Sequence, residues 1–232
     1  MKRLVTLILL LLFILSSFPA AADGGRSSFP EKAIAYMDIT FKCGCSRIGT
    51  GAMICTDGLL TAGHNLICKE HRKTADKINF YFGYVSKSDY FYLYNGHFHY
   101  WYLDGFKNGY HSRNDIGYVR FDENVGKKTG WLATRYGPDK EFDGKLCSIS
   151  AYSSDGELTE YSAQISIDSD LQFSLNQITL PYGGEGAPVY INRKGTPTLV
   201  AVYNSHTNRS CLGRRLTKEL FNEMRTRLTF SK

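Results

Sequence analysis

Short runs of apolar and aromatic residues, separated by glycine, asparagine and aspartate, recur between residues 33 and 211 of this 232-residue chain. The clearest of these runs are residues 78–85, 115–121, 145–151, 161–167 and 198–202. Runs of this length, bounded by turn-forming residues, are typical of short antiparallel β-strands. The pattern therefore predicts an all-β body.

Residues 89–102 alternate with aromatic side chains and are interrupted by Asn95-Gly96. This dipeptide suits the positive φ angles of a type I′ turn. We therefore expect residues 90–94 to pair with residues 97–101 as a β-hairpin.

The last part of the chain has a different period. Apolar side chains recur at helical spacing at Leu216, Leu220, Phe221, Met224 and Leu228. Thr217 is placed to act as an N-cap, because its side-chain oxygen can accept a hydrogen bond from the first turn. The pattern predicts one C-terminal helix that covers the β-rich body.

The first 22 residues have the layout of a secretory signal peptide: a basic start at Lys2-Arg3, an apolar run over residues 4–15 and three alanines at residues 20–22. The apolar run is too short to span a bilayer, which needs about 20 residues. We expect cleavage before Asp23, a secreted protein in an extracellular or periplasmic space, and no membrane attachment afterwards.

The formal net charge of +6 is mild and scattered, and two of the positive charges lie in the predicted signal peptide. Such a balance favours solubility and does not indicate a nucleic-acid partner. The least structured connection lies near residues 123–130, which predicts an N-terminal unit of residues 23–125 and a C-terminal unit of residues 126–232.

Six cysteines are present: Cys43, Cys45, Cys55, Cys68, Cys147 and Cys211. In an exported chain they are expected to form disulfides, although six cysteines allow fifteen connectivities and the sequence selects none of them. The Cys43-Gly44-Cys45 motif could instead belong to a metal or redox site. Its spacing is short and no second cysteine pair follows it, so we interpret it as structural.

Three segments carry candidate chemistry, in this order along the chain. They are Gly51-Ala52-Met53-Ile54 leading to Leu60-Thr61-Ala62-Gly63-His64, then Asn114-Asp115-Ile116-Gly117, then Gly183-Gly184-Glu185-Gly186-Ala187-Pro188. In order and spacing they resemble the three catalytic segments of trypsin-like serine proteases, and within that group the glutamyl endopeptidase or V8-like branch. The resemblance implies two packed six-stranded antiparallel β-barrels with a C-terminal α-helix, and an active site between the barrels.

The resemblance also implies roles for individual residues. His64 matches the general base, Asp115 the residue that orients it, and Glu185 occupies the position of the nucleophilic serine. The backbone N–H groups of Gly183 and Glu185 match the oxyanion hole. Gly184 departs from the aspartate that many activated relatives carry at this position.

A glutamate does not replace the serine chemically, because a carboxylate is a weak nucleophile and places negative charge beside the oxyanion hole. We therefore expect a secreted, catalytically inactive protease homologue that binds a protein or peptide through the former cleft or the aromatic residues 90–102. The alternative is an active V8-like serine endopeptidase. A metal held by His64, Asp115 and Glu185 is disfavoured, because Asp115 should lie behind the histidine.

Few other residues have a readable role. Alignment with the V8-like branch places Tyr203 on the strand that lines the specificity pocket, with His206 three residues later. His97-x-His99 puts two imidazoles on one strand face, but without a nearby carboxylate in the sequence we interpret them as part of an exposed hairpin. We expect no cofactor and no metal, and the sequence does not indicate an oligomeric state.

One electrostatic expectation follows from the implied site. If His64 lies between the carboxylates of Asp115 and Glu185, both favour the imidazolium, and the pKa of His64 should rise above its ordinary value of about 6.5.

Overall fold

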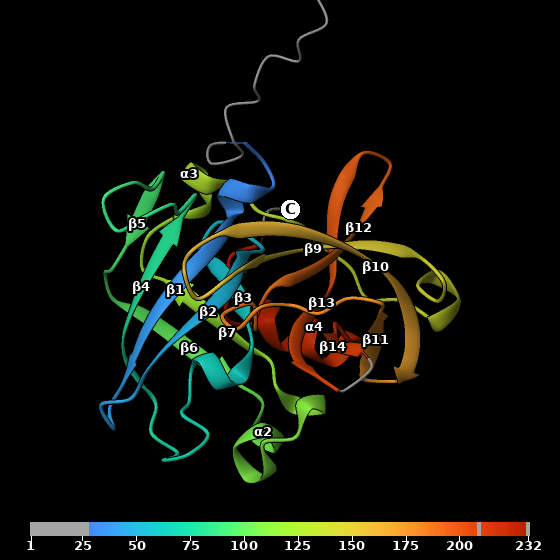
Figure 1. Cartoon of the computed structure of the whole chain (residues 1–232), viewed down its shortest axis with the longest axis horizontal. Helices are drawn as coiled ribbons and strands as arrows, with labels where there is room; N and C mark the ends of the chain where they lie inside the picture. Colours follow the sequence, from blue (N-terminus) through green and yellow to red (C-terminus); the bar gives the residue numbers. More distant parts are fainter. Residues whose placement is uncertain (1–27, 208–209, 231–232) are drawn as a thin grey trace, which may run out of the picture.

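The computed structural model of the chain describes residues 28–207 and 210–230. The signal sequence predicted at residues 1–22 lies outside the described residues. Within them, the strands form two sheets that lie side by side, antiparallel except for one short strand, the first sheet drawn in blue to green and the second in gold to orange (Figure 1). No helix in the described part of the chain has the length and apolar character needed to cross a bilayer.

The first sheet has seven strands among the described residues, in the spatial order β5-β4-β1-β2-β3-β7-β6, and all its pairings are antiparallel. The strands are β1 (Ile34–Phe41), β2 (Ser46–Met53), β3 (Gly58–Thr61), β4 (Ala75–Phe82), β5 (Tyr92–Tyr94), β6 (Phe98–Tyr102) and β7 (Gly117–Phe121).

The second sheet has the described order β12-β9-β10-β11-β14-β13-β8, and a further pairing of β12 with β13 closes six of these strands into a barrel. The short strand β8 is added to β13 in parallel. The strands are β8 (Ala133–Thr134), β9 (Leu146–Tyr152), β10 (Leu158–Ser169), β11 (Gln172–Asn176), β12 (Pro188–Arg193), β13 (Thr196–His206) and β14 (Ser210–Arg215).

Helical segments are short and lie before, between or after the strands. They are the 3₁₀ turns η1 (Glu31–Ala33), η2 (Gly63–Asn65), η3 (Ser112–Asn114) and η4 (Asp139–Glu141), and the α-helices α2 (Asp104–Gly109), α3 (Gly126–Thr129) and α4 (Lys218–Arg225). The predicted all-β body and C-terminal helix are confirmed. The predicted domain boundary stays a prediction; along the chain, the first sheet ends at Phe121 and the second begins at Ala133.

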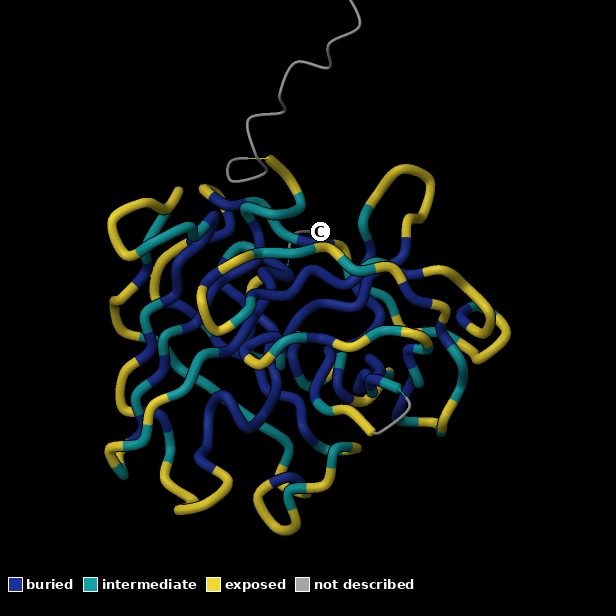
Figure 2. The backbone as a smooth tube through the Cα atoms, viewed as in Figure 1, coloured by how far each residue is buried: buried dark blue, intermediate teal, exposed yellow. Residues whose placement is uncertain are grey.

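Each sheet encloses its own apolar core, a third core joins the two sheets, and a smaller cluster that includes Tyr36 and Tyr152 also bridges them. Figure 2 shows buried chain running along the strands of both halves, with exposed chain concentrated in the connections. The joining core combines Leu60 and Tyr118 of the first sheet with Leu199 and Val202 of the second, and α4 adds Leu220 and Met224. Burial of this apolar surface fixes the relative positions of the two halves.

The expected hairpin of residues 90–94 with residues 97–101 is wrong. β5 pairs with β4 and β6 pairs with β7, so the two strands lie at opposite ends of the sheet order. Asn95-Gly96 connects them without strand pairing across it. The first sheet with its enclosed core is called the first barrel below, although it has seven strands instead of the expected six and no pairing of β5 with β6 closes it among the described residues. Most of the aromatic side chains of residues 90–102 pack against this core, while Tyr90 and Phe91 are exposed.

All six cysteines are free thiols in the structure. Cys147 and Cys211 lie in the core of the second barrel and Cys55 in the core that joins the barrels, whereas Cys43, Cys45 and Cys68 lie at the first barrel. The disulfides expected from the sequence therefore have no support in the structure.

Candidate functional site

His64 and Asp115 form a buried pair at the ends of two neighbouring strands. β3 and β7 are antiparallel, with Thr61 opposite Gly117, so η2 after β3 lies beside the residue that precedes β7. Asp115 Oδ2 lies 2.7 Å from His64 Nδ1, and Asp115 Oδ1 accepts a hydrogen bond from the His64 backbone N–H at 2.9 Å. The carboxylate therefore fixes both the ring and the main chain of the histidine.

Two other residues hold Asp115 in place. Asn204 Nδ2 donates to the Asp115 carbonyl at 3.0 Å and also to the Ser112 carbonyl, which ties the second barrel to this turn. Lys69 Nζ lies 3.6 Å from Asp115 Oδ2, with the lysine side chain partly exposed. Neither residue was predicted from the sequence, because both act through contacts between segments far apart in the chain.

The protonation of His64 differs from the sequence-based expectation. Its side chain is 2% exposed, and burial lowers the pKa of His64 below its ordinary value; Asp115 opposes this, while the positive charges of Arg47 and Lys69 lower the pKa further. The expectation of a raised pKa was wrong because burial outweighs the carboxylate partner. The Asp115 carboxylate accepts a hydrogen bond from Nδ1–H of His64, so the neutral ring carries its proton on Nδ1. Nε2 is then left with a free lone pair.

His64 Nε2 is buried and has no hydrogen-bond partner among the described residues. In particular, no hydrogen bond or ion pair joins it to the carboxylate of Glu185. A buried polar atom without a partner is costly, so this nitrogen is available to accept a hydrogen bond from a water molecule, a ligand or a reacting group.

Glu185 lies next to the histidine through its main chain. Its carbonyl accepts hydrogen bonds from the Thr50 N–H at 2.9 Å and from Asn65 Nδ2 at 2.8 Å. Asn65 directly follows His64, so the loop before β12 is fastened against η2. Gly186 allows this approach: its φ is +97°, and a Cβ there would lie 1.9 Å from the Thr50 carbonyl oxygen.

The side chain of Glu185 turns towards its own loop. Glu185 Oε2 accepts a hydrogen bond of 3.2 Å from the backbone N–H of Gly183. Gly183 has a φ of +99°, a conformation that glycine adopts without strain. The structure thus brings His64, Asp115, Glu185 and Gly183 into one region. The carboxylate of Glu185 contacts the Gly183 N–H and not the imidazole of His64.

Tyr203 lies on β13 with its side chain 1% exposed, within the core of the second barrel. Burial raises the pKa of this phenol, and its hydroxyl contacts the thiol of Cys211. His206 and Cys211 instead line a cavity of about 180 Å³ at the end of this strand. Substrate binding at Tyr203 stays a prediction.

The pair His97 and His99 has a carboxylate partner that the sequence did not reveal. Asp122 Oδ2 lies 2.9 Å from His97 Nδ1, and Asp122 Oδ1 lies 3.4 Å from His99 Nε2. Asp122 follows β7, the strand that pairs with β6, so only the pairing of strands shows this proximity. All three side chains are substantially exposed.

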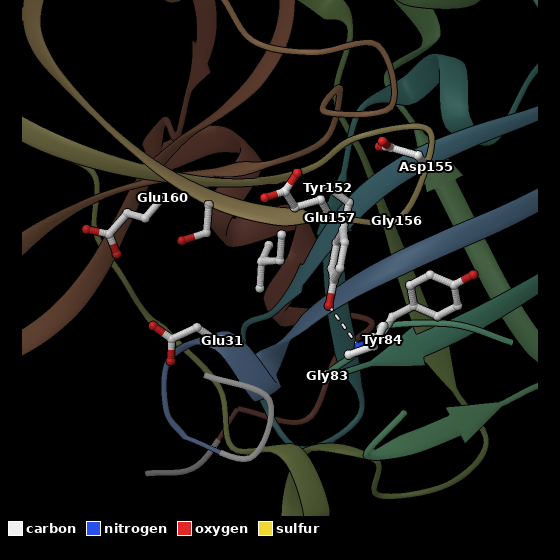
Figure 3. Close-up of a pocket in the computed structure, with 11 residues that line it drawn as sticks. Glu31, Gly83, Tyr84, Tyr152, Asp155, Gly156, Glu157 and Glu160 are labelled. Carbon is white, nitrogen blue, oxygen red and sulfur yellow. Dashed lines mark hydrogen bonds between the residues drawn. The ribbon is translucent and has the colours of Figure 1, made fainter. Parts of the chain in front are cut away.

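A larger cavity of about 590 Å³ lies away from His64, between the β4–β5 connection of the first barrel and the β9–β10 hairpin of the second. Tyr152 and Tyr84 line it, and the Tyr152 hydroxyl accepts from the Tyr84 N–H at 3.0 Å (Figure 3). Four carboxylates also line it: Glu31, Asp155, Glu157 and Glu160. The cavity is therefore locally acidic in a chain of positive net charge.

The fold matches those of known serine proteases. A Glu endopeptidase structure aligns with a TM-score of 0.74 and 22% identity, over 88% of this chain and 93% of that protein. The protease Anisep of Arthrobacter nicotinovorans aligns with a TM-score of 0.68 and 14% identity, over 82% of this chain and 92% of the other. The chain has the trypsin-like serine protease fold.

A third structure with this fold is a scabies mite protein described as an inactivated protease paralogue. It aligns with a TM-score of 0.65 and 17% identity, over 85% of this chain and 96% of that protein. No protein-family model matches the sequence, and no curated protein sequence matches it either. At these identities the likeness establishes the trypsin-like fold, and the chemistry has to be argued from this chain's own residues.

Proposed function

We propose that this protein is a secreted homologue of trypsin-like serine proteases that does not hydrolyse peptide bonds and acts by binding a protein or peptide segment. The observation that carries the proposal is the hydrogen bond from the Gly183 N–H to the Glu185 carboxylate, beside a His64 whose Nε2 has no hydroxyl partner. Glu185 takes the position at which the trypsin-like mechanism needs a serine.

Hydrolysis by the trypsin-like route has three requirements that this arrangement does not meet. The imidazole Nε2 must take a proton from a hydroxyl, the resulting alkoxide must attack a carbonyl, and backbone N–H groups must stabilise the oxyanion. Here a carboxylate replaces the hydroxyl, and it holds the Gly183 N–H on which an oxyanion would depend. Its negative charge also repels the charge that develops during attack.

The inter-barrel cavity supports a binding role and suggests the chemistry of the partner. Its carboxylates, including Glu31 and Glu157, favour lysine or arginine side chains, and the half-buried ring of Tyr84 offers apolar and cation–π contacts. Because the chain as a whole is basic, this acidity is a local feature and not a property of the entire surface. We therefore propose that the bound segment is basic.

Inactivity is tested with the chain from Asp23 onward, incubated with casein and with a mixture of short peptides. We expect no cleavage above a buffer control and no labelling by a fluorophosphonate probe of serine hydrolases. Glu185→Ser should restore at most weak labelling, because the His64–Asp115 pair and the Gly183 N–H remain, and Glu185→Ala is the matched control that should not label. Cleavage by the wild-type protein that survives Glu185→Ala but is lost in His64→Ala would show an active endopeptidase with another nucleophile.

Binding is tested by fluorescence anisotropy with labelled oligolysine and oligoglutamate peptides. We expect only oligolysine to bind. The double variant Glu31→Gln, Glu157→Gln should weaken binding by up to about fivefold per residue, as expected for exposed ion pairs worth up to ~1 kcal/mol. The double variant Asp168→Asn, Asp170→Asn, which removes two exposed charges that do not line the cavity, is the matched control. Equal weakening by the control would assign the effect to net charge and contradict binding in the cavity.

A further inference from the structure

Two tight turns meet at one end of the first barrel. Cys43 and Cys45 lie in the turn between β1 and β2, while Cys68 and His71 lie in the connection from η2 to β4. The Lys42 N–H donates to the Thr74 carbonyl at 3.0 Å and links the two turns through their main chains. Four side chains with metal-binding atoms are therefore held together by backbone contacts that do not depend on them.

Backbone geometry orients each pair of side chains. In the first turn, the Gly44 N–H donates to the Phe41 carbonyl, and Gly44 has a φ of +84° with open space around the position of a Cβ. In the second turn, the Cys68 N–H donates to the Lys73 carbonyl at 2.8 Å and the Arg72 N–H to the Cys68 carbonyl at 2.9 Å. Both turns are thus closed by their own hydrogen bonds.

The ligand atoms have the spacing of a tetrahedral site. The three sulfur atoms and the His71 nitrogen all lie within 4.8 Å of one another. His71 Nδ1 is 3.4 Å from Cys45 Sγ and 3.7 Å from Cys68 Sγ. Tetrahedral zinc, with Zn–S of about 2.3 Å and Zn–N of about 2.0–2.1 Å, places sulfur and nitrogen ligands about 3.6 Å apart.

We propose that Cys43, Cys45, Cys68 and His71 bind one zinc ion as a structural site. Three thiolates and one imidazole are a ligand set that zinc uses in closed, four-coordinate sites. Soft sulfur ligands in a tetrahedral arrangement disfavour magnesium and calcium, which take oxygen ligands. The site uses the Cys43-Gly44-Cys45 motif, for which the sequence spacing had not favoured metal binding. Its second half is Cys68-x-x-His71 instead of another cysteine pair.

Disulfide formation explains this cluster less well. A disulfide within it joins two sulfur atoms and leaves the third thiol and the imidazole without a role. The other three cysteines do not supply a partner, because Cys55 lies in the core that joins the barrels and the remaining two lie in the core of the second barrel. One ion satisfies all four side chains at once.

The proposed ion would act on the neighbourhood of His64. Cys68 follows His64 by four residues, and Lys69, which contacts Asp115, lies between the two predicted ligands of this connection. Zinc would fasten the segment that leaves η2 to the β1–β2 turn and so restrict the position of the imidazole. Because a structural zinc site forms only in the folded chain, its binding free energy also stabilises the fold.

The first test measures metal directly. Protein purified with zinc present, and then dialysed, should contain one equivalent of zinc per chain by elemental analysis. Replacement with Co²⁺ should produce the intense thiolate-to-cobalt charge-transfer absorption and the visible bands of tetrahedral cobalt. Cys68→Ser and His71→Ala should each weaken zinc binding by at least roughly 10–100-fold. This is the loss of metal affinity that follows when only a hydrogen-bond partner of a ligand is removed, and these variants remove a ligand itself.

Two control variants make the test specific. Cys147→Ser removes a buried thiol in the second barrel, and the double variant His97→Ala, His99→Ala removes the exposed histidine pair; both should keep one equivalent of zinc. Loss of zinc in the histidine double variant, with retention in Cys68→Ser and His71→Ala, would place the metal at His97 and His99 and overturn the proposal.

A measurement on the wild-type protein does not depend on whether the variants fold. Iodoacetamide followed by peptide mass mapping should leave Cys43, Cys45 and Cys68 unmodified in the zinc-loaded protein and modify them after treatment with a chelator. A disulfide that includes any of these three cysteines in protein purified with zinc would contradict the proposal. So would modification of the three thiols at the same rate with and without the chelator.

Discussion

At the scale of single residues, the state of His64 is decided by the competition between burial and a carboxylate partner. Asp115 makes a 2.7 Å contact with the ring and favours the imidazolium. Loss of solvation acts in the other direction and is the larger effect, so the pKa of His64 is lowered. At neutral pH the imidazole is therefore neutral, with its lone pair at the unpartnered Nε2.

The lowered pKa makes stability depend on pH in a defined direction. The unfolded chain binds a proton at His64 near pH 6.5, whereas the folded chain binds it only at lower pH. Stability should therefore be complete above about pH 6.5 and fall as the pH decreases through the folded pKa. We expect NMR titration of His64 to give a midpoint below pH 6.5. The Glu185→Gln variant should have nearly the same midpoint, because the carboxylate of Glu185 does not contact the imidazole ring.

The control for this prediction is His64→Gln, in which all other histidines remain. The difference in unfolding free energy between wild type and variant, measured by urea titration at several pH values, should shrink as the pH decreases below 6.5. A midpoint above 6.5, or a difference that grows at low pH, would show that Asp115 outweighs burial.

At the scale of elements, β5 and β6 show why local turn chemistry did not decide the pairing. Asn95-Gly96 suits a hairpin, but pairing with β4 and β7 lets each strand extend an existing sheet edge. Aromatic rings then approach across the two edges: the ring centroids of Phe80 and Phe98 are 5.4 Å apart, and those of Tyr94 and Phe121 are 4.7 Å apart. The packing of these rings outweighs a two-residue turn preference.

The C-terminal helix α4 shows the opposite case, in which local chemistry and tertiary packing agree. Thr217 caps it by accepting from the Leu220 N–H at 3.3 Å, and Leu220 and Met224 are buried in the core that joins the barrels. Thr217→Ala should lower the unfolding free energy by about 1 kcal/mol, since it leaves an N-terminal donor of the helix without its cap. Thr217→Ser, which keeps the hydroxyl, should retain most of the stability in urea unfolding; equal losses in both variants would assign the effect to the methyl group instead.

At the scale of the whole molecule, the two barrels are joined by polar contacts beside the site as well as by the shared core. Thr50 of β2 is fully buried, and its hydroxyl donates to the Gly183 carbonyl at 2.9 Å and accepts from the Tyr152 N–H at 3.1 Å. One hydroxyl of the first barrel therefore satisfies two backbone groups of the second, one of which belongs to the glycine that contacts Glu185.

Thr50→Val keeps the shape of the side chain and removes this link. Because a buried N–H and a buried C=O lose their partner, the unfolding free energy should fall by at least about 1–3 kcal/mol. Thr50→Ser should cost less, because it retains both hydrogen bonds. Thermal and urea unfolding of the three proteins provide the measurement, and a stable Thr50→Val protein would mean that these backbone groups find other partners.

The sequence by itself determined the β-strand content and the C-terminal helix with its Thr217 cap, and its resemblance to trypsin-like proteases implied the two-barrel arrangement. These features depend on local periodicity, on a short-range hydrogen bond, and on the order of three motifs. The order of the motifs also predicted that His64 and Asp115 lie together, and the structure places them as neighbours at adjacent strand ends; their catalytic roles stay a prediction.

Only the tertiary structure decided the properties that depend on contacts between distant segments. It placed Lys69 and Asn204 on Asp115, turned the Glu185 carboxylate to the Gly183 N–H, and assembled three thiols with His71. It also reversed the expected shift of the His64 pKa, because solvation depends on what covers a group and the sequence does not encode this locally. Periodicity fixes which residues face inward, but the partner of each buried polar group is chosen by the packing of the whole chain.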